Sequence, residues 1–297
     1  MGQIDKPCSM HNTTRKEGIS ITSPSLERLS KAHVGGWVES MTGKIEMMAH
    51  QCTFDPVKRT GKVPASLNLI PRDMYPQAVK AMKEAFKAKL TISDSVGVIH
   101  GEARVGQRLV PKNVVGLLAV SHIIYIGALL KCGIPAVPKF GGLLQIRDYE
   151  PLRFVDLIEY SSSSIDPSEI FLSCRMTSVN KVAKKGNGKI LASFLEVPAL
   201  TWPEVESVLQ MLVAGGVRGI LKLGGVGEGI CEVSVRPDHF GMVVLDGLNP
   251  VAASVEVGVD ITTSTVGEVI DFRELRSFRR LGAGGGDNRR QVVTEIV

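Results

Sequence analysis

The sequence predicts an α+β protein built as a tandem duplication of one ferredoxin-like βαββαβ unit. An internal repeat is the first observation behind this prediction: GKVPAS at 61–66 recurs as GKILAS at 188–193. The apolar run at 115–120 then matches the run at 240–245, and at that offset Gly133 aligns with Gly258 and Gly142 with Gly267. Glycines and apolar patterns held at a fixed offset indicate a duplicated structural unit.

The second unit shows the order of elements most clearly. A strand over 189–197 ends at Pro198, and Thr201 is expected to cap a helix that has Pro203 in its first turn and an apolar face reaching Gly215. Strands are expected at 220–223 and 240–245, then a short helix from about 249 to 258 and a final strand over 259–270.

The first unit repeats this order. We expect a strand at 62–70, a helix at 72–89, strands near Ser95 and Val114, a helix at about 123–132 and a final strand from Pro135. Each βαββαβ unit gives one sheet with two helices on one face, so the bare face needs a cover, which the duplicate can provide. Between the units, Asp166 and Pro167 indicate the start of a helix.

Four regions follow from these boundaries. They are an N-terminal segment at 1–33, unit one at 34–160, unit two at 161–278 and a basic, flexible tail at 279–297. The tail carries Arg279, Arg280, Arg289 and Arg290, for which weak attraction to phosphate is an alternative to simple solvation.

Composition indicates a soluble cytoplasmic protein without a metal or cofactor. The chain has 297 residues, is 44% hydrophobic and carries a net charge of +5, too small a surplus to indicate nucleic-acid binding by itself. Its five cysteines are odd in number and contain no C-x-x-C pair, which is typical of a reducing compartment. The pairs Cys8–His11 and His50–Cys52 lack a second pair at zinc-ligand spacing.

The apolar run at 114–130 is just shorter than the roughly 20 residues of a membrane span. Ser121, His122 and Tyr125 interrupt it, so a buried strand followed by a buried helix is the better interpretation.

Catalysis finds little support in the residue pattern. The six histidines are scattered, and no serine or cysteine nucleophile stands beside a plausible base. The glycine-rich stretch at 224–229 lies between two predicted strands and opens no long helix, so a dinucleotide-binding loop is not indicated. We therefore expect a protein that is not an enzyme.

Several motifs, taken in order, resemble the regulatory domain of the archaeal nitrogen repressor family NrpR. In the first half they are TFDP at 53–56, GKV at 61–63, KCGIP at 131–135, PKFGG at 138–142 and RFVDLI at 153–158. In the second half they are NGKILA at 187–192 and GLNPVAA at 247–253. The resemblance runs from about Val34 to Phe278.

This resemblance implies a repressor, or co-repressor, of nitrogen fixation and assimilation genes in methanogenic archaea, responding to 2-oxoglutarate. Full-length members of the family begin with a winged helix-turn-helix, whereas residues 1–33 resemble only a remnant of the linker to that module. A member of this kind is expected either to act beside a helix-turn-helix NrpR paralogue or to bind operator DNA by means that the sequence does not show. The resemblance also implies self-association, as a dimer, and partnership with a PII-type protein.

A dicarboxylate effector needs cationic side chains and free backbone N–H groups. Lys139, Gly141 and Gly142 offer a cation beside a backbone that an anion can approach, and Arg153 can contact a carboxylate with two N–H groups. Ser121 and His122 fall at the start of a predicted helix, which favours anions.

Alignment of the units favours unit one as the effector site. Lys139 aligns with Ser264, and Ser121 aligns with Asp246, so a site in unit two would lose a cation and gain a repelling carboxylate. An alternative function is a small-molecule-binding protein, or an enzyme acting on a 2-oxo acid, that uses the same fold.

Overall fold

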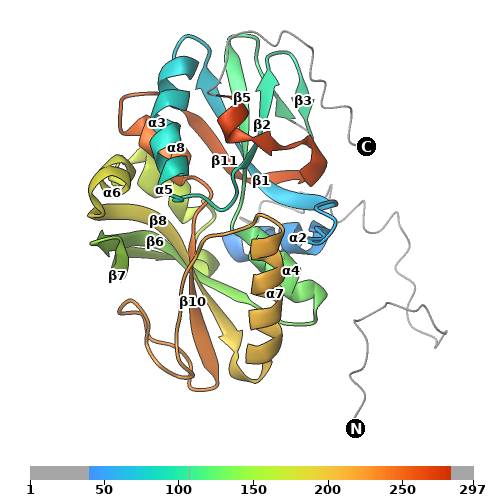
Figure 1. Ribbon diagram of the computed structural model, residues 1–297, viewed down its shortest axis with the longest axis vertical. Coiled ribbons are helices and arrows are strands. Elements are labelled where there is room, and N and C mark those ends of the chain that lie inside the picture. The colour runs from blue at the N-terminus through green and yellow to red at the C-terminus, as the bar shows by residue number, and fades with distance from the viewer. Residues whose placement is uncertain (1–39, 107, 282–297) are drawn as a thin grey trace, which may run out of the picture. The chain divides into compact units, whose positions relative to one another are not determined.

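Two five-stranded antiparallel sheets contain all the strands predicted for the two repeats (Figure 1). The computed structural model describes residues 40–106 and 108–281. The first repeat comprises β1 (Lys62–Pro71), α3 (Tyr75–Lys87), β2 (Ser95–His100), β5 (Val114–Val120), α4 (Ile123–Lys131) and β6 (Val137–Arg147). The second comprises β8 (Gly188–Pro198), α7 (Trp202–Ala214), β9 (Ile220–Leu223), β10 (His239–Leu245), α8 (Asn249–Val255) and β11 (Thr262–Asp271).

Each sheet takes its last strand from the other repeat. The first sheet has the order β11-β1-β5-β2-β12, where β12 is Arg276–Ser277, and the second has β7-β6-β8-β10-β9, where β7 is Glu150–Glu159. A ferredoxin-like sheet has the order 4-1-3-2. Here β11 of repeat two pairs with β1, and β6 of repeat one pairs with β8. The α+β class and the duplicated unit are confirmed, with the additional finding that the repeats exchange their final strands.

The second helix of each repeat is exchanged together with the strand. Helix α8 packs against α3, and α4 lies against α7. Ser254 Oγ of α8 donates a hydrogen bond to the Ala78 carbonyl oxygen of α3, at 3.0 Å. The boundary near residue 160 therefore separates the sequence repeats but not the two sheets.

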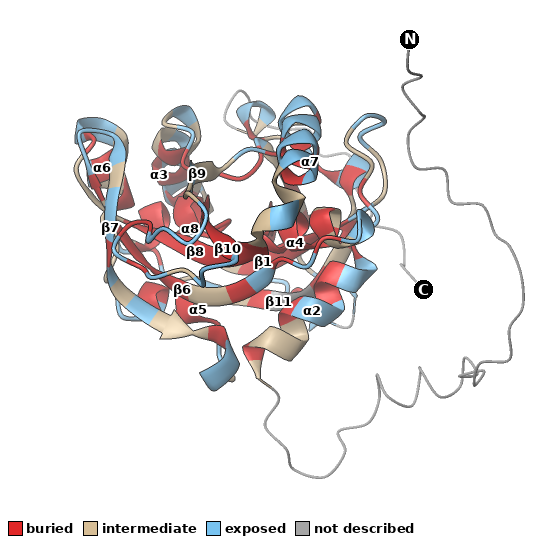
Figure 2. Cartoon of the chain, turned by 90° about the horizontal axis from the view of Figure 1, so that it is seen from below, coloured by how far each residue is buried: buried red, intermediate tan, exposed pale blue. Residues whose placement is uncertain are grey.

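Burial follows the central strands of both sheets. In β8 the residues Ile190 to Val197 are all buried, and β10 is buried along its whole length. Figure 2 shows buried residues concentrated on the strands and on the inner sides of helices such as α3 and α7, whose outer sides are exposed. The apolar run at 114–130 is β5 followed by α4, as the sequence indicates, and none of the described helices is long and apolar enough to cross a bilayer.

Several elements lie outside the repeated pattern. Asp166 caps α5 as predicted, because its Oδ1 accepts a hydrogen bond from Ser168 N at 2.7 Å. Sequence patterns did not indicate α2, β7 or α6. The additional elements are α2 (Met41–Gln51), β3 (Arg104–Val105), β4 (Arg108–Leu109), η1 (Tyr160–Ser162), α5 (Pro167–Ser173), α6 (Val179–Lys185), η2 (Ala199–Thr201), η3 (Phe272–Glu274) and η4 (Phe278–Arg280).

One predicted cap is wrong. Thr201 occupies the N-cap position of α7, but its hydroxyl donates to the Pro198 carbonyl oxygen at 2.8 Å and leaves the helix amides uncapped by its side chain. The segment 1–33, the Cys8–His11 pair and the tail from residue 282 onward lie outside the described residues. Within the described part of the chain, no group of three or more His, Cys, Asp or Glu side chains is arranged to hold a metal ion.

Candidate functional site at the crossing of the two repeats

The exchange requires two connections to pass each other, and they do so in direct contact. One runs from β5 to α4 through Ser121 and the other from β10 to α8 through Asp246 and Gly247. Both are anchored alike: Ser121 N donates to the Pro64 carbonyl oxygen at 2.9 Å, and Asp246 N donates to the Leu191 carbonyl oxygen at 3.1 Å. A Cβ atom on Gly247 would lie 2.3 Å from the Val120 carbonyl oxygen, so only glycine fits at this contact.

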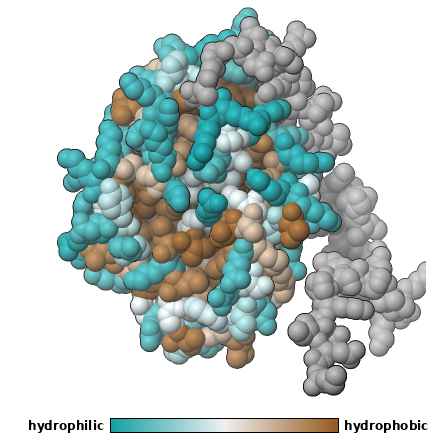
Figure 3. Space-filling view, viewed as in Figure 1, coloured by the Kyte–Doolittle hydropathy of each residue, from teal (hydrophilic) through white to brown (hydrophobic). Residues whose placement is uncertain are grey.

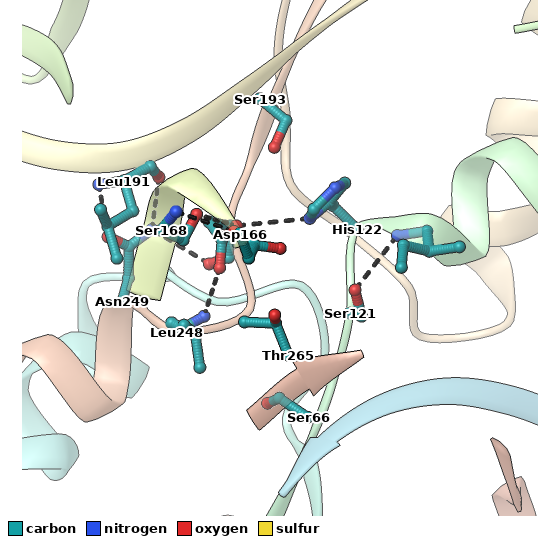
Figure 4. A network of polar contacts seen from close by, with 12 residues as sticks. Ser66, Ser121, His122, Asp166, Ser168, Leu191, Ser193, Leu248, Asn249 and Thr265 are labelled. Carbon is teal, nitrogen blue, oxygen red and sulfur yellow. Dashed lines mark hydrogen bonds and ion pairs between the residues drawn. The ribbon is translucent and has the colours of Figure 1, made fainter. Parts of the chain in front are cut away.

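A buried histidine joins the two connections (Figure 4). His122 Nδ1 of the first lies 3.3 Å from Asp246 Oδ2 of the second. On the other side of the ring, Nε2 lies 3.4 Å from the Tyr160 hydroxyl, which is 2.9 Å from Ser193 Oγ on β8. All four side chains are buried. With both ring nitrogens protonated, His122 donates to Asp246 and to Tyr160, and Tyr160 donates to Ser193.

Two carboxylates share this network through one serine. Ser168 N donates to Asp166 Oδ1 at 2.7 Å, and Ser168 Oγ donates to Asp246 Oδ2 at 2.8 Å. Asp246 Oδ1 accepts a further hydrogen bond from Leu248 N at 2.8 Å. The second oxygen of Asp166, Oδ2, is buried and has no hydrogen-bond partner among the described residues. One carboxylate is therefore fully satisfied and the other is not.

Burial and neighbouring charges shift the pKa values of these groups in different directions. Burial alone lowers the pKa of His122, but the hydrogen bond to Asp246 and the charges of Asp246 and Asp166 outweigh it, and the pKa is raised. Burial raises the pKa of Asp246, yet the hydrogen bond and charge of His122 and the donors Leu248 and Ser168 lower it overall. Burial and the charge of Asp246 raise the pKa of Asp166 to about 6.

This network can therefore hold one buried cation, one fixed anion and one carboxyl that gains or loses a proton near neutral pH. Burial also raises the pKa of Tyr160 well above its usual value, so its hydroxyl remains a neutral hydrogen-bonding group. An anion that enters the network can accept a hydrogen bond from His122, and protonation of Asp166 would remove a competing charge.

A second set of polar groups lies on the first-sheet side of the crossing, where Figure 4 places Ser66 and Thr265. Ser66 Oγ donates to the Ala119 carbonyl oxygen at 3.4 Å and accepts from Asn68 Nδ2 at 3.1 Å. Thr265 of β11 donates through its backbone N and its hydroxyl to Glu169 Oε1 of α5, at 2.6 and 2.7 Å. Glu169 thus covers part of the free edge of β11.

Three of the six residues predicted for an effector site come together here. Ser121 Oγ accepts from Ile123 N at the start of α4, at 3.4 Å, and His122 follows it in the chain. Gly141 of β6 faces the same network, because a Cβ atom there would lie 2.9 Å from the Tyr160 hydroxyl and 2.8 Å from Pro167 Cβ.

The other three predicted residues lie elsewhere. Gly142 faces β7, where a Cβ atom would lie 2.4 Å from the Asp156 carbonyl oxygen. Arg153 is half-exposed: its Nε donates to Gln145 Oε1 at 3.1 Å and its Nη1 lies 3.6 Å from Glu232 Oε2. It pairs four residues along β6 from Gly141, about 13 Å away.

Lys139 is half-buried beside an irregularity in the pairing of β6 with β8, and it makes no ion pair within the described residues.

The remaining network residues were missed as site residues. Sequence patterns indicated Asp246 only as a repelling charge and Asp166 only as a helix cap, and they gave no role in a site to Tyr160, Ser168 or Ser193. The alignment held a usable signal, because Asp246 directly follows β10 and His122 is the second residue after the aligned strand β5. Residues that follow equivalent strands of a duplicated unit can meet at the axis between the copies.

Comparison with known proteins identifies the family. Residues 38–277 match the family described as NrpR regulatory domains NRD1 and 2. The chain belongs to this family.

Relatives named as nitrogen regulators agree with this assignment. The Methanosarcina mazei global nitrogen regulator NrpRI is 30% identical over 268 residues, which cover 89% of this chain and 82% of that protein. The global nitrogen regulator NrpR of Methanocaldococcus jannaschii is 25% identical, and that of Methanococcus maripaludis is 27% identical. The matches cover 92% and 89% of this chain, but the chain spans only about half (46%) of either relative.

A solved structure shares the fold. The nitrogen repressor-like protein from Methanococcus jannaschii superposes with a TM-score of 0.69 at 26% identity, covering 82% of this chain and 100% of that one. The buried network therefore lies within an NrpR regulatory-domain fold.

Proposed function

We propose that this chain is an effector-sensing regulator of transcription, a co-regulator (co-repressor) of nitrogen fixation and assimilation genes that responds to 2-oxoglutarate or a similar dicarboxylate. Membership of the NrpR regulatory-domain family and the nitrogen-regulator names of its relatives support this role. The structural observation that carries the proposal is the contact between His122 and Asp246, a buried ion pair that bridges the two repeats.

The position of this ion pair supports a sensing mechanism. A carboxylate that accepts a hydrogen bond from His122 competes with Asp246, which belongs to the other repeat. Binding would therefore change the contact between the two connections and, through them, the positions of α4 and α8, the helices that follow them. A ligand shifts a protein between two arrangements only when it binds one of them more tightly, and this exchange of partners provides such a difference.

Proton uptake should accompany binding. An incoming anion raises the pKa of a nearby carboxyl, and Asp166, with a pKa of about 6, is already close to protonation at neutral pH. We expect 2-oxoglutarate to bind more tightly at pH 6 than at pH 8. Lys139 lies on β6, two residues before Gly141, and has no ion-pair partner within the described residues. Its positive charge would attract the same anion without belonging to the buried network.

Partnership with other proteins is part of the proposal. We expect self-association as a dimer, association with a helix-turn-helix paralogue and a PII-type protein, and a cytoplasmic location. Figure 3 shows apolar side chains gathered across the middle of one face, over the region of β6, β8 and β10. Leu152, Val155 and Leu157 of the outer strand β7 are exposed apolar side chains that a second copy can cover.

Calorimetric titration with 2-oxoglutarate tests the effector proposal. The experiment compares the unsubstituted chain with His122→Asn, Lys139→Ala and, as a control outside the network, Arg153→Ala. Each titration is run in two buffers of different ionisation enthalpy, which reveals the number of protons taken up. We expect saturable binding with proton uptake, weakened at least about tenfold by His122→Asn and unchanged by Arg153→Ala. Absence of binding at millimolar concentration, or loss of binding only in Arg153→Ala, would remove the proposed site.

A further inference from the structure

A period of three residues marks the segment that follows β11. Residues 272–280 read FRELRSFRR, so that Phe272, Leu275 and Phe278 recur every third residue and an arginine follows each of them. The three apolar side chains are buried, whereas Arg273, Arg276 and Arg279 are exposed. The three buried residues form an apolar row, and the three arginines form an exposed row beside it.

The buried row fixes the segment rigidly to the first sheet. The Phe272 ring lies 4.6 Å from the Phe54 ring, and the Phe278 ring stacks on Phe86 at 3.9 Å with an interplanar angle of 11°. Backbone hydrogen bonds add to this, because Phe272 N donates to the Gly61 carbonyl oxygen at 2.9 Å and β12 pairs with β2. The backbone positions of the arginines on such a segment are fixed before binding, which reduces the entropy lost when they bind a ligand.

A further arginine approaches this segment from a distant loop. Arg59 lies over the Phe272 ring, with its guanidinium carbon 5.7 Å from the ring centroid. Together with Arg273, Arg276 and Arg280 it lines a pocket of about 390 Å³, whose other walls are Ser95, Phe272, Leu275 and Ser277. Four arginines from two distant segments of the chain thus line one pocket.

Carboxylates balance only part of the positive charge around this pocket. Arg273 pairs with Asp271, at 2.7 Å, and Glu274 is the other carboxylate of the segment. Within the part of the chain that the structure describes, Arg59, Arg276 and Arg280 form no ion pair. Like charges brought together without partners repel one another, and an anionic ligand removes that cost.

We infer that this arginine pocket binds the phosphate backbone of duplex DNA. Guanidinium groups match phosphate oxygens with two N–H donors each, and several guanidinium groups around one pocket suit a ligand that carries several anionic groups. Among the described residues, no base-reading element accompanies the pocket, so the contact would be independent of sequence. This inference builds on the proposed role in transcription, but it does not involve the effector site.

Fluorescence anisotropy of a labelled duplex of arbitrary sequence, about three helical turns long, tests the inference. The full chain without effector is titrated at several salt concentrations. The test variant is Arg276→Ala with Arg280→Ala, and the matched control is Lys184→Ala with Lys185→Ala, which removes the same charge from the exposed side of α6. Loss of two phosphate contacts should weaken binding at low salt and reduce the slope of log K against log salt by about 1.8.

Three results would overturn the inference. They are no duplex binding by the unsubstituted chain at low salt, equal losses in the two double variants, and stoichiometric binding of inorganic tripolyphosphate at the pocket without binding of the duplex. Calorimetry with 2-oxoglutarate on the same arginine variant separates this inference from the proposed function, because effector binding should not change.

Discussion

The two connections that cross at the centre of this molecule descend from one repeated unit, yet they have become chemically opposite. The first places Ser121 and His122 after β5, and the second places Asp246 and Gly247 after β10. One supplies a buried cation and the other a buried anion, and the glycine leaves room for the chain that it crosses. The difference shows how a duplicated fold can acquire a buried ion pair, His122–Asp246, that neither copy would have alone.

A second difference lies one turn farther along. At the start of α8, Asn249 Oδ1 accepts a hydrogen bond from Leu191 N and Asn249 Nδ2 donates to the Leu191 carbonyl oxygen, both at 2.9 Å. The aligned residues of the first repeat are Ile124 and Pro64. Proline has no N–H to satisfy, so an apolar isoleucine suffices there. Each repeat has a matched pair of residues, and mixing the pairs should cost stability.

Removing the cationic residue of the His122–Asp246 pair should have the largest effect on stability. His122→Ala leaves Asp246 buried without its ion-pair partner, and we expect a loss of about 3–5 kcal/mol in the free energy of unfolding. Urea unfolding followed by circular dichroism measures the change. The double variant His122→Ala with Asp246→Asn removes the buried charge and should recover part of the loss. A single variant that costs less than about 1 kcal/mol would mean that the two connections are not locked by this pair.

The pH dependence of stability should reveal the incompletely hydrogen-bonded carboxyl of Asp166. The pKa of Asp166, about 6, is above the ordinary value of 3.8, so the folded protein holds this proton more tightly than the unfolded chain does. Stability should therefore fall as pH rises from about 4 to 6, by up to about 3 kcal/mol. The raised pKa of His122 causes a further loss above about pH 6.5.

Asp166→Asn separates these two contributions. Asparagine keeps the cap of α5 but does not titrate, so the decline between pH 4 and 6 should flatten while the decline above pH 6.5 remains. Thermal unfolding across this pH range measures both. An unchanged profile in the variant would show that another group causes the acid-range dependence.

Mixing the matched pairs should have an intermediate effect. Asn249→Ile leaves the buried N–H of Leu191 without its partner, while the Leu191 carbonyl oxygen keeps its hydrogen bond from Asp246 N, and this should cost about 2–3 kcal/mol. Adding Leu191→Pro removes the N–H and reproduces the pair of the first repeat, so the double variant should be more stable than Asn249→Ile alone. Additive losses in a double-mutant cycle would contradict the idea that these residues are matched.

The smallest effect is expected at the point of closest approach. Gly247→Ala places a methyl group against the Val120 backbone, and we expect a cost of about 1–3 kcal/mol from overpacking. Gly225→Ala is a suitable control, because the atoms closest to its added Cβ belong to the Glu228 side chain, which can move. Equal unfolding midpoints for the two variants would show that the crossing is loosely packed.

These results also indicate what the sequence was able to predict. The repeat placed every strand and helix that the two copies share, because glycine spacing and apolar runs report local structure directly. It did not predict the exchange, because β6 and β11 carry equivalent patterns and either is compatible with the edge of either sheet. Strand β7 was missed because Pro151 interrupts its pattern, and Asp246 was misjudged because an aligned position was treated as an isolated charge.

Hydrogen–deuterium exchange with and without 2-oxoglutarate tests the central claim most directly, because it shows where the effector acts. If the crossing of the repeats is the sensing element, exchange rates should change together at the starts of α4 and α8 and around Tyr160 to Ser168, and the change should be larger at pH 6 than at pH 8. A change confined to β6 and β7 around Arg153, or no change at saturating effector, would contradict it.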